Sequence, residues 1–303
     1  MDLLIGFATI LVVIAAGTGL AHAGVLDLRS QRTLAEIAFF VASPALMVVT
    51  ISKVHLEAAA ANLVASSVSL GACFAAYVLI ARLRWGLATG PLLIGALTSS
   101  YVNAGNLGLA MGAYVVGDIT VVVPTLLVQM LVVQPVALIV LDRVTGRGGG
   151  VGPALRRLVT NPLTIAAVVG LVLALTGWRL PVAVDSPLQM LAGAAIPLML
   201  MSYGAALRLS PPLGRAGHNG EVLVASVLKL AVMPVVAWLV GVALGLDDRV
   251  LLGVVITAAL PTAQNIFLHA TRYRVGEDVA RETILVTTLA SLPVALLVAV
   301  VLG

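Results

Sequence analysis

Ten long apolar runs restrict the folds open to this sequence more than any other feature. Each run has about 17–25 residues, the length that an α-helix needs to cross a hydrocarbon core of about 30 Å. Inside such a core only helices and closed barrels satisfy the backbone, so the runs predict an all-α membrane protein with ten transmembrane helices. They fall at 2–20, 33–52, 60–81, 90–116, 119–141, 161–178, 187–207, 222–245, 250–271 and 281–302.

The composition agrees with a membrane protein. The chain is 61% hydrophobic and only 10% charged, whereas soluble domains carry about 25% charged residues. The 17 Lys and Arg residues exceed the 13 Asp and Glu residues, but the basic residues lie in short loops, which indicates topology and not nucleic-acid binding. Lys53 and Lys229 are the only lysines, a bias typical of a GC-rich bacterial genome.

The basic residues also predict the orientation. Thirteen of the 17 lie in the loops after spans 1, 3, 5, 7 and 9, namely Arg29, Arg32, Arg82, Arg84, Arg143, Arg147, Arg156, Arg157, Arg208, Arg215, Arg272, Arg274 and Arg281. Because cytoplasmic loops are enriched in Lys and Arg, these loops are expected inside the cell. The chain is therefore predicted to cross the cytoplasmic (inner) membrane of a bacterium many times, with both termini outside.

One pattern occurs twice along the chain. An asparagine in an apolar run is followed at fixed spacing by tyrosine, glycine and an acidic residue, as Asn106, Tyr114, Gly117, Asp118 and again as Asn265, Tyr273, Gly276, Glu277. Five spans per half is an odd number, so the second half must enter the membrane in the opposite sense. The prediction is a first five-helix repeat at 1–141, a cytoplasmic linker at 142–160 and a second, inverted five-helix repeat at 161–303.

Spans 4 and 9 carry residues that weaken a helix near mid-membrane. Asn103, Gly105 and Asn106 lie in span 4, and asparagine and glycine are poor helix formers. In span 9, Pro261 removes a backbone donor shortly before Gln264 and Asn265. Broken helices at membrane depth line cavities, and their half-helix N-termini suit anions. We therefore expect a substrate site at two facing breaks. Alternatively, Gly105, Gly108 and Gly112 form a close helix-packing face.

Two further positions are candidate substrate-binding residues. Lys229 is the one charged residue well inside a span, and an intramembrane lysine is a candidate functional residue. Its ammonium could attract an anion or stand in for a coupling cation, or the side chain could extend to the cytoplasmic interface. Ser43 precedes Pro44 in span 2 and offers a hydroxyl at a predicted kink, although a bend for packing alone is equally compatible with this pattern.

The sequence does not predict an enzyme or a metal protein. Cys73 is the single cysteine, so there is no disulfide framework and no CxxC motif. No GxSxG or HExxH motif occurs. We expect no catalytic residue, no bound metal and no cofactor. The sequence leaves open whether the chain forms a homodimer.

The motifs resemble those of the auxin efflux carrier family, which includes plant exporters and bacterial permeases. The resemblance rests on the ten-span layout, the Asn-x-Gly-Asn-x-Gly stretch at 103–108, Asn161-Pro162-Leu163, and Pro261 before Gln264-Asn265. It implies a fold like that of the sodium/bile-acid symporters, with spans 4 and 9 unwound and crossed and a transport bundle that moves against a scaffold. It also implies that the substrates are small mono- or dicarboxylates, such as malate or malonate.

The sequence thus predicts a permease that moves a small organic carboxylate through the lipid bilayer by alternating access. One alternative is a sodium-coupled organic-anion symporter, although sodium sites usually include a carboxylate and the spans have none at mid-membrane. A channel and an intramembrane enzyme are the remaining alternatives. Saturation of transport with substrate would separate a carrier from a channel.

Overall fold

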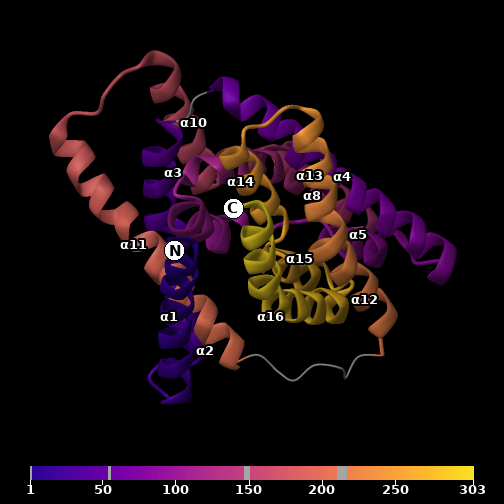
Figure 1. Ribbon diagram of the computed structural model, residues 1–303. Helices are drawn as coiled ribbons and strands as arrows, with labels where there is room; N and C mark the ends of the chain where they lie inside the picture. The colour runs from indigo at the N-terminus through magenta and orange to yellow at the C-terminus, as the bar shows by residue number, and fades with distance from the viewer. Residues whose placement is uncertain (1, 54–55, 147–150, 210–216) are drawn as a thin grey trace. The chain divides into compact units, whose positions relative to one another are not determined.

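Figure 1 shows the computed structural model of the chain, which describes residues 2–53, 56–146, 151–209 and 217–303. These described residues form helices and connecting segments and contain no β-strand, which confirms the all-α prediction. Within them, seven segments are long and apolar enough to cross a membrane, at Ile5–His22, Leu28–Ile51, Ala60–Trp85, Ile119–Val144, Val182–Leu209, Asn219–Ala243 and Glu277–Leu302.

The seven long segments fall on seven of the ten predicted spans. The other three predicted spans contain shorter helices. The sixth holds the single helix α10 (Pro162–Thr176), whereas the fourth and the ninth each hold helices separated by a non-helical stretch. The arrangement of ten spans as two inverted repeats stays a prediction.

The chain divides into two compact units, and neither unit coincides with one half of the sequence. Unit 1 comprises Met1–Ala59, Gly105–Val123 and Arg157–Pro211, and unit 2 comprises Ala60–Ala104, Pro124–Arg156 and Pro212–Gly303. Each unit therefore combines segments from both sides of the predicted linker. In that linker the described residues include a helix, α9 (Val151–Thr160). Residues 147–150, and with them Arg147, lie outside the described residues, as does Arg215.

Apart from a few residues of η2, α4 and α7 at the unit boundaries, the units are built from the following elements. Unit 1 contains α1 (Asp2–His22), α2 (Leu28–Ile37), η1 (Ala38–Ala42), α3 (Ser43–Ile51), η2 (Ala104–Gly108), α6 (Leu109–Met111), η3 (Gly112–Val116), η4 (Ile119–Val122), α10 and α11 (Val182–Leu209). Unit 2 contains α4 (Leu56–Trp85), α5 (Thr89–Thr98), α7 (Val123–Val128), η5 (Gln129–Val133), α8 (Gln134–Val144), α12 (Asn219–Val227), η6 (Leu228–Val232), α13 (Met233–Ala243), α14 (Asp248–Ala258), α15 (Asn265–Tyr273) and α16 (Glu277–Leu302).

Side-chain caps begin several of these helices. Asp27, Asp118, Asn161 and Asp247 each accept a hydrogen bond from a backbone N–H in the first turn that follows. Such caps satisfy donors that have no partner inside the helix. Hydrogen bonds from Ser30 also hold the pKa of the Asp27 carboxyl below its ordinary value. The polar residues between the apolar runs therefore determine where helices start.

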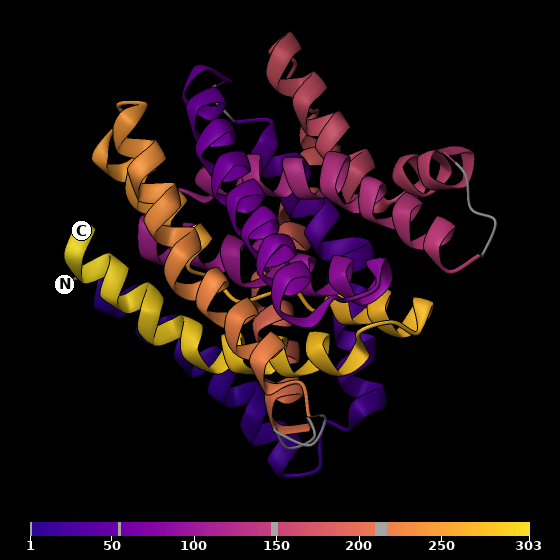
Figure 2. The ribbon, with the colours of Figure 1, turned by 90° about the vertical axis from the view of Figure 1, so that its right-hand side faces the viewer.

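Three π-helical turns precede three prolines. The turns η1, η5 and η6 lie directly before Pro44, Pro135 and Pro234, which occupy the first turns of α3, α8 and α13. A proline lacks the N–H of its turn and its ring clashes with the carbonyl four residues earlier. A wider turn relieves that clash while the helix continues. In Figure 2, α12, η6 and α13 accordingly run on as one helical rod (orange).

Glycines allow two helices of unit 1 to pack at close range. A Cβ at Gly17 of α1 would lie 2.1 Å from the carbonyl oxygen of Met201, and a Cβ at Gly204 of α11 would lie 2.0 Å from that of Ile14. The Thr18 hydroxyl donates to the Gly204 carbonyl at 2.9 Å across the same interface. Small residues at such contacts let backbones approach in a lipid environment.

Unit 2 has a core on α5, α8, α15 and α16. Its buried members are Ile94, Leu97, Tyr101, Ala137, Leu138, Leu141, Ala263, Ile266, Ala270, Tyr273 and Ala280. Two of the four helices, α5 and α15, lead into or out of the non-helical stretches of the fourth and ninth spans. This core therefore lies in the same unit as both non-helical stretches.

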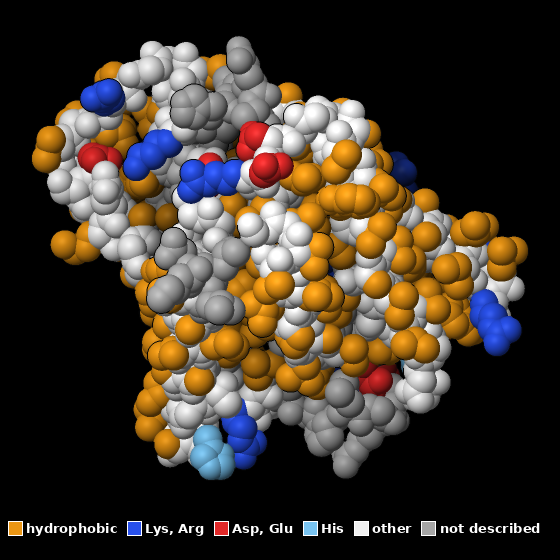
Figure 3. All heavy atoms as spheres, viewed as in Figure 1, with side chains coloured by type: hydrophobic (Ala, Val, Ile, Leu, Met, Phe, Trp, Pro, Cys, Tyr) orange, Lys and Arg blue, Asp and Glu red, His pale blue; other side chains and the backbone are white. Residues whose placement is uncertain are grey.

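Apolar side chains also cover the outside of the helices. Val12, Leu83, Met190 and Val301 are between 67% and 81% exposed, and hydrophobic side chains occupy much of the face in Figure 3. Apolar surface on this scale marks a protein that contacts a partner or a membrane. The length of the helices assigns it to the lipid.

Candidate functional site

The fourth and ninth spans are both interrupted, and their non-helical stretches meet. Helix α5 ends at Thr98 and α14 ends at Ala258. Beyond these ends, Val102 and Thr262 form an isolated antiparallel β-bridge. The Asn103 N–H donates to the Pro261 carbonyl at 2.9 Å. The Ala263 N–H donates to the Tyr101 carbonyl at 3.1 Å. We call residues 99–103 and 259–264, both in unit 2, the crossing.

Gln129 hydrogen-bonds to the first segment of the crossing, residues 99–103. Its side-chain oxygen accepts from the Val102 N–H and its amide nitrogen donates to the Val102 carbonyl at 3.0 Å. Gln129 is 1% exposed and is the first residue of the π-helical turn η5. One amide side chain thereby replaces both hydrogen bonds that Val102 would make in a helix, and it removes the cost of two unpaired buried groups.

Threonine side chains hydrogen-bond to or from the second segment of the crossing, residues 259–264. The Thr262 N–H donates to the Thr287 hydroxyl at 3.1 Å, and the Thr262 hydroxyl donates to the Thr98 carbonyl. Thr287 lies on α16, and all three threonines are buried. The contributions of Gln129 and Thr287 were not predicted from the sequence. The available signal was a polar residue in an apolar run on each span that follows an interrupted one.

Two predicted site residues have open hydrogen-bonding capacity at the crossing. Asn103 is 3% exposed, and its side-chain nitrogen has no partner within the described part of the chain. The side-chain oxygen of Asn265, at the start of α15, likewise has none there. The Asn265 amide also interacts with the Tyr101 hydroxyl. A buried donor and a buried acceptor on adjoining segments are costly unless a ligand or water satisfies them.

Pro261 and Gln264 belong to the same segment. Pro261 supplies a bridge carbonyl and is itself buried. Gln264 precedes α15, where its backbone carbonyl accepts from the Phe267 N–H at 3.1 Å and its side chain makes no capping bond. Its half-buried amide therefore remains available beside Asn265.

Lys229 does not extend to the membrane surface. The side chain is 0% exposed, and its Nζ atom donates to the Ala258 carbonyl at 2.7 Å and contacts the Met233 sulfur at 3.4 Å. The interpretation that it extends to the interface is therefore wrong, because a nearer acceptor exists at the end of α14. Lys229 contacts the residue directly before the crossing.

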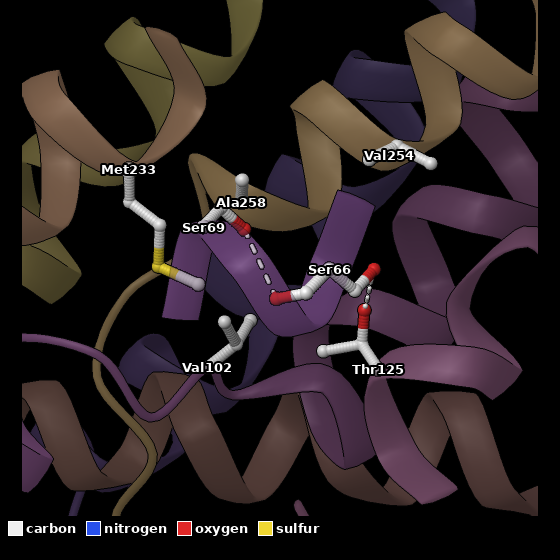
Figure 4. Close-up of a pocket in the computed structure, with 7 residues that line it drawn as sticks. All are labelled: Ser66, Ser69, Val102, Thr125, Met233, Val254 and Ala258. Carbon is white, nitrogen blue, oxygen red and sulfur yellow. Dashed lines mark hydrogen bonds between the residues drawn. The ribbon is translucent and has the colours of Figure 1, made fainter. Parts of the chain in front are cut away.

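A small hollow lies beside this contact. Figure 4 shows Ser66 and Ser69 of α4, Thr125 of α7 and Val102 of the crossing around it. Met233, Val254 and Ala258 complete the lining. The Thr125 hydroxyl donates to the Ser66 hydroxyl at 2.9 Å, and the Ser69 hydroxyl donates to the Ser66 carbonyl at 3.1 Å. One side of the hollow is thus rich in oxygen atoms.

Three predicted site residues belong to unit 1. Gly105 and Asn106 lie in the π-helical turn η2 and are half-buried. Ser43 is buried, and its hydroxyl contacts the Met199 sulfur at 3.5 Å. Gly112 packs against Ile119 within the same unit. A substrate role for Ser43, Gly105 and Asn106 stays a prediction.

The second half of the chain is similar to a known protein family. Residues 151–299 match the model of a family described as membrane transport protein. The chain is 28% identical over 152 residues to "Auxin efflux carrier component 4" of Arabidopsis thaliana and to "Auxin efflux carrier component 3a" of Oryza sativa, in each case over 49% of this chain and 24% of the relative. It is 31% identical over 137 residues to a Rhizobium meliloti protein named "Putative malonate transporter", over 45% of this chain and 42% of the relative.

These matches confirm the resemblance to the auxin efflux carrier family. The family and the relatives are named for transport and not for catalysis, in agreement with the prediction that the chain is not an enzyme. The chain spans about a quarter of the length of the plant relatives that it matches.

Proposed function

We propose that this chain, whose second half matches the model of a family described as membrane transport protein, is a secondary transporter for a small organic anion. The substrate is a mono- or dicarboxylate, and it crosses the cytoplasmic membrane of a bacterium by alternating access. Inward- and outward-facing states exchange by movement of one bundle of helices. The division of the chain into two compact units is consistent with such a movement.

The observation that supports this function best is the unpaired amide of Asn103 at the crossing. Its buried nitrogen is a donor with no partner among the described residues. A carboxylate has only acceptors when ionised, so it complements that donor. Asn265 adds a buried acceptor, which suits a hydroxyl or a protonated carboxyl group on the same substrate.

Lys229 contributes positive charge close to the crossing in this proposal. Its ammonium bonds the last residue of α14, and charge interactions in a low-dielectric interior extend further than in water. The ammonium therefore favours an anion at the crossing even without direct contact. The name of the Rhizobium meliloti relative makes malonate the first substrate to test.

Uptake of radiolabelled malonate and malate into proteoliposomes tests the function. Wild-type protein should show saturable uptake. A hydrogen bond to a charged group contributes about 1.5–3 kcal/mol, so Asn103→Ala and Asn265→Ala should each lower uptake at limiting substrate roughly 10- to 100-fold. Asn106→Ala tests the predicted contribution of unit 1.

Gln189→Ala is the matched control for these variants. Gln189 is an amide on α11 whose side chain bonds Asp185 on an exposed surface, so its loss should leave uptake unchanged. Unchanged uptake in both Asn103→Ala and Asn265→Ala, with folded protein in the membrane, would refute the site.

A sodium-coupled symporter is the second candidate. The hydroxyls of Ser66, Ser69 and Thr125 around one hollow favour it, because hard cations prefer oxygen ligands. Uptake that requires a sodium gradient, and stops when choline replaces sodium, would establish this alternative.

A further inference from the structure

The carbonyl of Ala258 loses its helical partner because of Pro261. At the end of a helix the last carbonyls have no N–H ahead of them within the helix. A tightened last turn would take the N–H of residue 261 for Ala258, but proline has none. The next N–H, of Thr262, donates to Thr287. The neighbouring carbonyl of Thr257 is satisfied by the Leu260 N–H at 3.2 Å.

Lys229 supplies the missing donor from another helix. Its Nζ atom lies 2.7 Å from the Ala258 oxygen, at the end of α14, where the helix dipole favours positive charge. Lys229 lies in the π-helical turn η6, which accommodates Pro234. Two prolines therefore create this contact, since one frees the carbonyl and the other widens the turn that carries the lysine.

The groups that the structure describes around the Lys229 ammonium are neutral, as in a site where neutral ligands bind a cation, and do not form an ion pair. No ion pair among the described residues includes Lys229. Its ammonium instead contacts a carbonyl oxygen, that of Ala258, and the Met233 thioether. Met233 and Ala258 also line the hollow that the hydroxyls of Ser66, Ser69 and Thr125 share.

We propose that the Lys229 ammonium occupies a monovalent-cation site of unit 2, as a covalently attached substitute for a free ion. The Lys229 ammonium binds the Ala258 carbonyl oxygen. When the lysine is removed, a free cation would bind that carbonyl together with the hydroxyls of Ser66, Ser69 and Thr125 around the adjoining hollow. The wild-type protein therefore needs no alkali cation at this position. For transport, which rests on the proposed function, the consequence is uptake without sodium in the wild type and cation-dependent uptake after removal of Lys229.

Thermal unfolding of the purified full-length protein tests the site without any transported substrate. Melting temperatures are measured in sodium, potassium, ammonium and N-methylglucamine chloride at equal ionic strength. Wild type should melt at one temperature in all four salts. Lys229→Ala opens space beside the carbonyl, so it should melt lower in N-methylglucamine and several degrees higher with at least one small cation. The double variant Lys229→Ala/Ser69→Ala should lose most of that rise.

Two further variants distinguish the effect of the Lys229 charge from the effects of its hydrogen bond and of its side-chain volume. Lys229→Met fills the space without charge and should melt low in all four salts. Lys229→Gln keeps a donor without charge and should also remain less stable than wild type in N-methylglucamine. Full stability of Lys229→Gln in that salt overturns the proposal, as does a melting temperature of Lys229→Ala that is equal in all four salts. A wild-type protein that sodium specifically stabilises also overturns it. Because no organic anion is present, these results do not depend on whether the protein carries one.

Discussion

Gln129 stabilises the crossing through a single side chain, so its contribution can be tested by one substitution. Both ends of its amide bond the backbone of Val102, so Gln129→Leu leaves two buried backbone groups unpaired. Each such group costs about 1–3 kcal/mol. We expect the variant to melt several degrees below wild type and to lose uptake. Gln189→Leu, at an exposed amide, should melt like wild type. Equal melting of Gln129→Leu and wild type would show that the crossing does not depend on this side chain.

At the scale of single residues, the helix interruptions could be predicted from the sequence, but the hydrogen-bond partners of the interrupted segments could not. Asparagine and glycine in span 4 and Pro261 in span 9 predict the interruptions, because each weakens a helix by itself. The partners of Val102 and Thr262 come from other helices, Gln129 on η5 and Thr287 on α16. The same holds for Lys229. Its position inside a span was predictable from the sequence, but its hydrogen-bond acceptor was not, because that acceptor lies at the end of another helix, α14.

The packing of α1 against α11 allows a prediction at the scale of elements. A Cβ at Gly17 would collide with the Met201 backbone, whereas a Cβ at Gly19 of the same helix meets nothing within 4 Å. Overpacking costs about 1–3 kcal/mol, so Gly17→Val should lower the melting temperature by several degrees. Gly19→Val is the matched control and should not. Equal melting of the two variants would show that close approach of these helices contributes little to stability.

The elements also show why helix geometry is harder to predict than helix location. The apolar runs predicted where most helices lie, because the position of a membrane-spanning helix follows from the length and hydropathy of the run. The three π-helical turns that precede prolines were not predicted, because an apolar run with a proline fits either a kink or a widened turn. Two of these turns carry Gln129 and Lys229. A polar residue five or six positions before a proline, inside an apolar run, is the signal that was available.

At the scale of the whole molecule, the predicted orientation has a direct chemical test. Cys73 is buried, so the native chain gives a low background with a membrane-impermeant maleimide. Ala183 and Ala88 are exposed and lie at loops predicted on opposite sides of the membrane. Ala183→Cys should be labelled from outside intact cells. Ala88→Cys should be labelled only after permeabilisation. Labelling of Ala88→Cys from outside, with Ala183→Cys protected, would reverse the topology.

The division of the molecule into two units was expected only from the resemblance to a family with a bundle and a scaffold. The repeat pattern predicts halves at 1–141 and 161–303, yet each compact unit draws on both halves. The repeat pattern depends only on the order of residues along the chain, whereas the compact units depend on which helices contact one another. Hydropathy cannot distinguish these contacts, because lipid-facing and buried helices are similarly apolar.

Isothermal titration calorimetry of organic anions against the purified protein tests whether the crossing binds a carboxylate. Asn103→Asp is the decisive variant, since it keeps the size of the side chain and replaces its unpaired donor with a negative charge. We expect saturable binding of malonate or a related carboxylate to wild type and loss of that binding in Asn103→Asp. Equal affinity in the two proteins would contradict the claim that the crossing binds the anion.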